Sequence, residues 1–200
     1  MTVFQLLMLG ASAFFAFKIF QHIQTLQDPQ PSSQDNSEDA PRSADAFSTF
    51  DSSSLIQKGD EALEDGDLQK ALAIYSEANI KEPKSAETLF KMGYTLGLQG
   101  RNDEALDYYK EILEFDKNNT YVHQAMASIY RKNSEFASAK LHLNALVEID
   151  DLNPITFYNY GNLYADMEHP QEAKNMYIKA LELNPDFSEA KEELEKLQVG

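Results

Sequence analysis

Beyond residue 51, apolar and small residues recur at the spacing of amphipathic helices, in blocks that are separated by short polar turns. The pattern is clearest in a row of alanines 34 residues apart, and three more rows keep the same step without an insertion. The four rows are Ala71, Ala105, Ala139 and Ala173; Gly59, Gly93, Ala127 and Gly161; Tyr75, Tyr109, Leu143 and Tyr177; and Ala78, Ile112, Leu146 and Ala180. A fixed period of this length predicts an α-solenoid, in which similar helix pairs stack on one another.

The residue types in these rows fit such a stack. Small residues at the Gly59 and Ala71 rows let two antiparallel helices approach closely, and we expect the aromatic row to fill the gap to the next pair. Polar turns with Gly, Asn or Pro fall between the helices of each pair, at residues 65–67, 99–102, 133–135 and 168–170. The sequence therefore predicts an all-α fold with two helices per period.

The last period carries the fullest signature, with Phe157, Tyr160, Gly161, Tyr164, Ala173, Tyr177, Ala180 and Pro185. On these residues the chain resembles the tetratricopeptide repeat family, with four repeats over 52–187, at 52–85, 86–119, 120–153 and 154–187. Three positions depart from the family pattern: Lys58 replaces a leucine, as in a solvent-facing first repeat, His123 stands where a large aromatic ring usually packs, and Asp151 replaces the terminal proline of the third repeat. Residues 188–200 continue with apolar residues at helical spacing and charge elsewhere, which predicts a C-terminal capping helix.

The N-terminus has a different pattern. Residues 1–20 are apolar and carry no charge before Lys18, and about 20 helical residues span the hydrocarbon core of a bilayer. We predict one transmembrane anchor over residues 1–22; a cleaved signal peptide or a core helix are the alternatives. Lys18 and Arg42 follow the apolar stretch and no basic residue precedes it, which favours a membrane protein whose repeats face the cytoplasm.

Residues 23–51 are rich in Ser, Pro, Gln and acidic residues, and they predict a disordered tether between the anchor and the repeats. Phe47 and Phe50 are its apolar exceptions. We expect them to pack on the first repeat, and a short docking motif is the alternative.

The resemblance implies a concave groove, lined by the first helix of each repeat, that binds an extended or helical segment of another protein. The family's groove positions select eight candidate partner-binding residues: Phe90, Tyr94, Tyr121, Gln124, Ser128, Arg131, Tyr158 and Asn162. Aromatic and arginine side chains dominate the energy of many protein interfaces, although any one ring could instead pack between helices. Family members that clamp the C-terminal carboxylate of heat-shock chaperones have Lys and Asn where this chain has Ile56 and Asp60. Because an aspartate repels a carboxylate, the resemblance argues against that use.

Charge and composition narrow the function further. With 17 basic and 33 acidic residues the net charge is −16, which argues against nucleic acid and favours neutral or basic protein partners. The chain has no cysteine, none of its four histidines lies at ligand spacing from another, and no catalytic motif is present, so we expect no cofactor, no metal and no enzyme. The sequence favours a single-pass membrane adaptor or scaffold. The alternative is a self-associating structural protein, a homo-oligomer with an empty groove.

Overall fold

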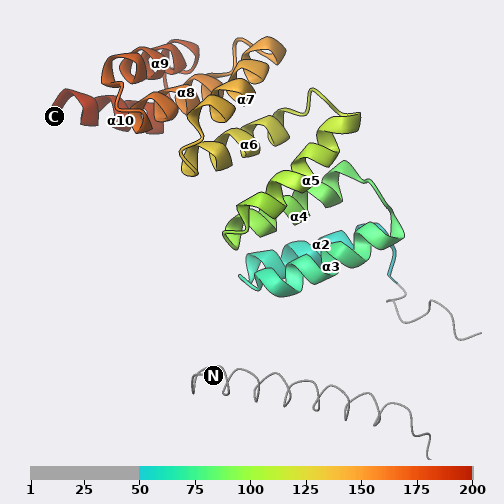
Figure 1. Cartoon of the computed structure of the whole chain (residues 1–200). Coiled ribbons are helices and arrows are strands. Elements are labelled where there is room, and N and C mark those ends of the chain that lie inside the picture. The colour runs from blue at the N-terminus through green and yellow to red at the C-terminus, as the bar shows by residue number, and fades with distance from the viewer. Residues whose placement is uncertain (1–49, 200) are drawn as a thin grey trace, which may run out of the picture. The chain divides into compact units, whose positions relative to one another are not determined.

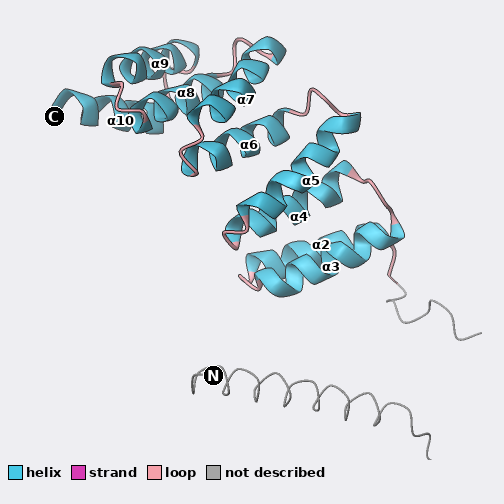
Figure 2. Cartoon of the chain, in the orientation of Figure 1, coloured by secondary structure: helices cyan, strands magenta, loops and turns pink. Residues whose placement is uncertain are grey.

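The computed structural model describes residues 50–199, and every regular element in that range is an α-helix (Figures 1 and 2). The helices are α2 (Ser52–Glu64), α3 (Leu68–Lys81), α4 (Ala86–Leu98), α5 (Asn102–Phe115), α6 (Thr120–Lys132), α7 (Phe136–Ile149), α8 (Pro154–Asp166), α9 (Pro170–Leu183) and α10 (Ser188–Val199). Successive helices pack as pairs, α2 with α3 through α8 with α9, and each pair packs on the next. The predicted all-α solenoid is confirmed for this part of the chain.

The helix boundaries keep the period of the sequence. The first helices of successive pairs begin at Ser52, Ala86, Thr120 and Pro154, each 34 residues after the one before. Ser188 is the next position in this series, so α10 takes the place of the first helix of a fifth pair. The buried Ala190 joins α10 to the core of the last repeat.

Capping side chains explain where the first helices begin. Asp51, Ser85, Asn119 and Asn153 each precede a first helix, and each side chain accepts a hydrogen bond from a backbone N–H of the first turn. Such a bond satisfies an N–H group that has no partner inside the helix. The short polar residues between the repeats therefore fix the register of the stack.

The small and aromatic rows meet inside each pair. A Cβ atom added to Gly59 would lie 2.3 Å from the ring of Tyr75, and one added to Gly161 would lie 2.3 Å from the ring of Tyr177. Each ring therefore packs directly against the glycine of its own helix pair, whereas the sequence predicts that it fills the gap to the next pair. In the first repeat Tyr75 shares a buried cluster with Met92 of α4, and this cluster joins one pair to the next.

The predicted anchor at 1–22 lies outside the described residues, as does the tether at 23–51 apart from its last two residues. Within residues 50–199, no helix has the length and apolar character needed to cross a bilayer. Phe50 is described, and the ammonium group of Lys58 lies 2.9 Å from the centre of its ring. The lysine that departs from the family pattern thus has an aromatic partner just before α2.

Candidate protein-binding site

A hollow of about 640 Å³ opens between the first helices of the first three repeats, α2, α4 and α6. Its lining residues are Leu63, Ala86, Glu87, Phe90, Lys91, Tyr94, Asn119 and Tyr121. Three of the eight predicted partner-binding residues, Phe90, Tyr94 and Tyr121, are therefore brought together in one place. Its volume is in the range of pockets that hold small ligands or a few side chains.

Aromatic rings form one wall of this hollow. Phe90 and Tyr94 are one turn apart on α4, and their rings are nearly parallel with centres 6.5 Å apart. Tyr121, in the first turn of α6, presents its ring edge-on to Phe90 with centres 6.4 Å apart. Tyr94 is 46% exposed and Tyr121 is 72% exposed, so two rings that contact Phe90 are accessible to solvent. Exposed rings held in this way are suited to binding an apolar side chain of a partner.

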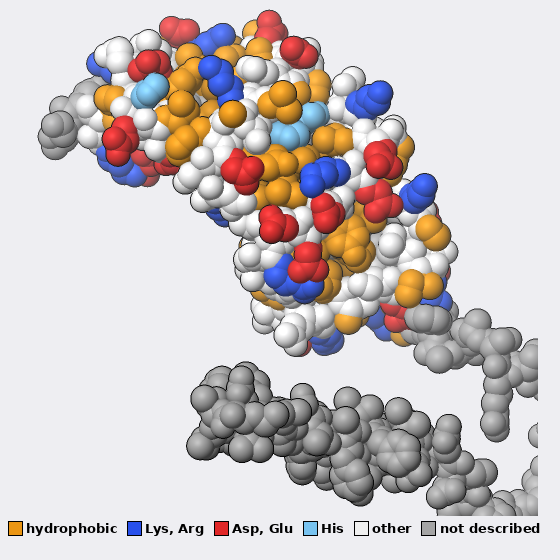
Figure 3. All heavy atoms as spheres, in the orientation of Figure 1, with side chains coloured by type: hydrophobic (Ala, Val, Ile, Leu, Met, Phe, Trp, Pro, Cys, Tyr) orange, Lys and Arg blue, Asp and Glu red, His pale blue; other side chains and the backbone are white. Residues whose placement is uncertain are grey.

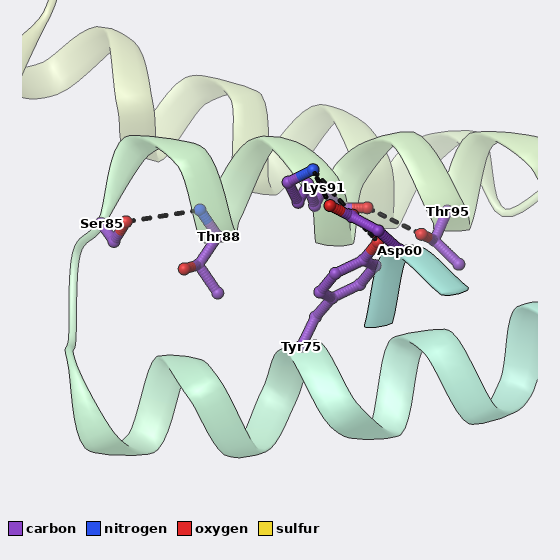
Figure 4. Close-up of polar contacts among 6 residues, drawn as sticks. All are labelled: Asp60, Tyr75, Ser85, Thr88, Lys91 and Thr95. Carbon is purple, nitrogen blue, oxygen red and sulfur yellow. Dashed lines mark hydrogen bonds and ion pairs between the residues drawn. The ribbon is translucent and has the colours of Figure 1, made fainter. Parts of the chain in front are cut away.

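Lys91, which lines the hollow, belongs to a polar network with Asp60 and Tyr75 (Figure 4). The Lys91 ammonium lies 2.7 and 2.9 Å from the two carboxylate oxygens of Asp60, and the Tyr75 hydroxyl donates a 2.6 Å hydrogen bond to one of them. Burial, and after it the hydrogen bond to Asp60, hold the pKa of Tyr75 well above its usual range. Lys91 therefore offsets the charge of Asp60, and Asp60 is not the isolated negative charge that the sequence predicts.

The other five predicted residues lie elsewhere, in the last two repeats. Arg131 forms an ion pair with Asp166 of α8, with 2.5 Å between the nitrogen and the oxygen. Asn162 accepts a 2.8 Å hydrogen bond from the Tyr177 hydroxyl. Tyr158 packs against Phe187, with ring centres 5.0 Å apart. The ion pair joins the third repeat to the fourth, and the other two contacts lie within the fourth repeat. Gln124 and Ser128 are half-buried on α6.

Sequence reasoning missed Glu87 and Lys91. Lys91 lies 31 residues after Asp60 and one helical turn before Tyr94, the equivalent of Asp60 in the second repeat. The repeat register therefore places Asp60 and Lys91 on facing helices. Glu87 occupies in the second repeat the position that Tyr121 occupies in the third, and Tyr121 has the most exposed ring of the hollow. A comparison of equivalent positions in adjacent repeats could have identified both residues.

The wider surface is mixed in charge. On the face drawn in Figure 3, acidic and basic side chains are interspersed and hydrophobic side chains lie between them. Among the described residues, no group of three or more His, Asp or Glu side chains is placed to hold a metal ion.

A stack of helix pairs in fixed register, open to an aromatic hollow between first helices, defines the class of helical repeat proteins. Family models described as "Tetratricopeptide repeat" match residues 62–129 and 156–187, together half of the chain. The chain belongs to the tetratricopeptide repeat family.

Relatives and solved structures agree with this assignment. The chain is 31% identical to human RNA polymerase II-associated protein 3 over 147 residues, which are 72% of this chain and 20% of that protein. The chain thus spans about a fifth of the length of that curated relative. The structure of PilF from Pseudomonas aeruginosa superposes with a TM-score of 0.66 at 22% identity, covering 74% of this chain and 68% of that one. A second similar structure is the first TPR of Spaghetti (RPAP3) bound to the HSP90 peptide SRMEEVD, with a TM-score of 0.53 and 29% identity over 59% of this chain and 94% of that one.

Proposed function

We propose that this protein is a non-enzymatic adaptor that is held at a membrane and binds a segment of a partner protein in the hollow between α2, α4 and α6. The observation that carries the proposal is the convergence of Phe90, Tyr94 and Tyr121 on one hollow, with two of the rings open to solvent. Aromatic anchors in a concave, preformed surface are typical of protein and peptide recognition.

The peptide-bound relative supports a protein segment as the ligand. Its TPR domain holds a peptide of HSP90, and this chain matches that domain at 29% identity. We expect the present chain to use the same kind of surface for a different sequence. Ile56 and Asp60 stand where the resemblance assigns the lysine and asparagine of a carboxylate clamp, so those two side chains are absent here.

The membrane part of the proposal rests on the apolar residues 1–22. An anchor raises the local concentration of the repeats near a membrane-bound partner, so a modest affinity of the hollow suffices. The repeats are proposed to face the cytoplasm, on the evidence of Lys18 and Arg42. The full chain should stay in the membrane pellet after alkaline washing, and a variant that lacks residues 1–22 should be released; release of the full chain would refute the anchor.

Photocrosslinking tests the binding site directly. A photoreactive phenylalanine analogue at position 121 should crosslink to a partner protein in native membranes, and Tyr94→Ala in the same chain should abolish that crosslink. The same analogue at Leu141, which is 66% exposed on α7 and does not line the hollow, is the matched control. Crosslinks to a second copy of the chain alone would support the self-associating alternative and contradict the adaptor.

A further inference from the structure

We infer that the hollow selects a partner segment that places a lysine or arginine beside Glu87 and an apolar side chain against the aromatic wall. The inference rests on the proposed function and adds the chemistry of the ligand to it. It is based on a comparison between the charged groups around the hollow that already have a partner within the chain and those that do not.

Most polar groups of the hollow are already used within the chain. Lys91 contacts both carboxylate oxygens of Asp60, so the two charges offset each other. The Asn119 side chain accepts a hydrogen bond from the Val122 backbone N–H and donates another to Asp116. These groups shape the hollow and have little capacity left for a ligand.

Glu87 is the exception. Its side chain is exposed in the first turn of α4, at the edge of the hollow, and within residues 50–199 no ion pair joins it to a basic residue. The hollow therefore presents one uncompensated negative charge next to its exposed rings, and a basic side chain of the partner is its complement.

The same arrangement disfavours an acidic ligand. A carboxylate that sought Lys91 would have to displace Asp60, and it would then lie near Glu87 as well. Like charges brought together without compensation weaken binding and exclude wrong partners. The peptide SRMEEVD, which the similar structure contains, has two adjacent glutamates and a final aspartate and should bind poorly here.

The acidic stretch of this chain before the repeats does not fit the hollow on the same grounds. The stretch from residue 28 to residue 47 contains five acidic residues and one arginine, so its charge has the same sign as that of Glu87. Charge complementarity thus points to a separate protein as the occupant.

Peptide selection tests the inference. A random 12-residue phage library is selected on the full chain in nanodiscs, and peptides that also bind the double variant Tyr94→Ala/Tyr121→Ala are discarded. The retained peptides should be enriched in Lys and Arg over Asp and Glu relative to the library. The enrichment should vanish with Glu87→Gln and persist with Glu114→Gln, which removes an exposed acid of α5 outside the hollow.

Fluorescence anisotropy on the most enriched peptide then gives the size of the effect. Glu87→Gln should weaken binding about two- to five-fold, as expected for one exposed ion pair. Replacing the basic residue of the peptide by Glu should weaken binding about tenfold, because attraction becomes repulsion.

The outcomes separate the inference from the proposed function. Peptides that need Tyr94 and Tyr121 but show no basic bias, or a bias that Glu87→Gln leaves intact, would overturn the inference alone. A selection that yields no peptide dependent on the two tyrosines would overturn both.

Discussion

His123 and His142 lie ring to ring inside the third repeat, with 2.9 Å between their Nδ1 atoms and less than a tenth of each residue exposed. The Nε2 atom of His123 lies 2.9 Å from the Lys117 carbonyl oxygen, which can only accept. When both rings are neutral, His123 carries its proton on Nε2, and His142 donates from its Nδ1–H to the Nδ1 atom of His123. The Tyr130 ring stacks on His142 at 5.5 Å.

Stability should depend on pH through this pair. Burial, and after it the proximity of His123, lower the pKa of His142 to about 4. Above about pH 6.5, the pKa of a histidine in the unfolded chain, His142 is neutral in both the folded and the unfolded state. Its contribution to the free energy of unfolding is then fully present. As the pH falls from there towards 4, the unfolded chain takes up a proton that the folded chain does not. The free energy of unfolding should then decrease with a slope approaching about 1.4 kcal/mol per pH unit.

Urea unfolding between pH 7 and pH 4 measures this slope. The matched control is His123→Leu/His142→Ile, which copies the Leu55 and Ile74 found at the same two positions of the first repeat. The control should lose the part of the slope that comes from the pair while keeping the part that comes from carboxylates. Equal slopes in the two proteins would show that the pair does not govern acid stability.

Gly161 should not tolerate a methyl group. The ring of Tyr177 would lie 2.3 Å from the new Cβ, and that ring is buried and held by its hydrogen bond to Asn162. Gly161→Ala should therefore lower the free energy of unfolding by about 1–3 kcal/mol, the usual range for overpacking. Thermal or urea unfolding monitored by circular dichroism measures the loss.

The third repeat supplies the compensating change. There the same two positions hold Ala127 and Leu143, both buried. The double variant Gly161→Ala/Tyr177→Leu should recover part of the stability that Gly161→Ala loses, because the smaller side chain makes room for the methyl group. No recovery would mean that the contact between ring and glycine is not what limits this position.

The turns inside the repeats offer a stabilising change. Gly66, Gly100, Ser134 and Glu168 occupy the same position of successive repeats, and all four have positive φ, between 59° and 78°. Side chains are strained in this region and glycine is not. Ser134→Gly and Glu168→Gly should each stabilise the protein by up to about 1 kcal/mol, whereas Gly100→Ala should destabilise it by about as much. Melting temperatures that move in the opposite directions would contradict this reading of the turns.

The ion pair between Arg131 and Asp166 should contribute little to stability. The two side chains are 27% and 42% exposed, and partly exposed pairs of this kind are worth less than about 1 kcal/mol. A double-mutant cycle with Arg131→Ala and Asp166→Ala measures the coupling energy. A coupling of several kcal/mol would show that the pair is instead a main link between the third and fourth repeats.

The sequence predicts the stack well because its signal is local and repeated. The step between Ala71 and Ala105 sets the period, and the cap and turn residues set where each helix begins and ends. The packing of Tyr75 against Gly59 of its own pair differs from the expected filling of the gap to the next pair, because the rows give the residue types but not which helix face each ring takes. Period, caps and small residues all favour the same register.

The polar contacts of the site could not be predicted in this way. Asp60 and Lys91 are 31 residues apart and Arg131 and Asp166 are 35 residues apart, so each pair joins neighbouring repeats. His123 and His142 are 19 residues apart on the two helices of one repeat, far from the spacing that marks ligands on a single helix. Such partners depend on how adjacent helices face each other, and the hydrophobic period alone does not determine which polar side chains then meet.

The central claim is that the hollow beside Tyr94 and Tyr121 holds a segment of another protein. The most direct test is isothermal titration of the full chain with the segment that crosslinks at position 121, compared with the variant Tyr94→Ala/Tyr121→Ala. We predict that the variant keeps its helical circular dichroism spectrum and binds at least about tenfold more weakly, as the loss of aromatic anchors requires. Equal affinity of the two proteins, with the fold intact in both, would contradict the account.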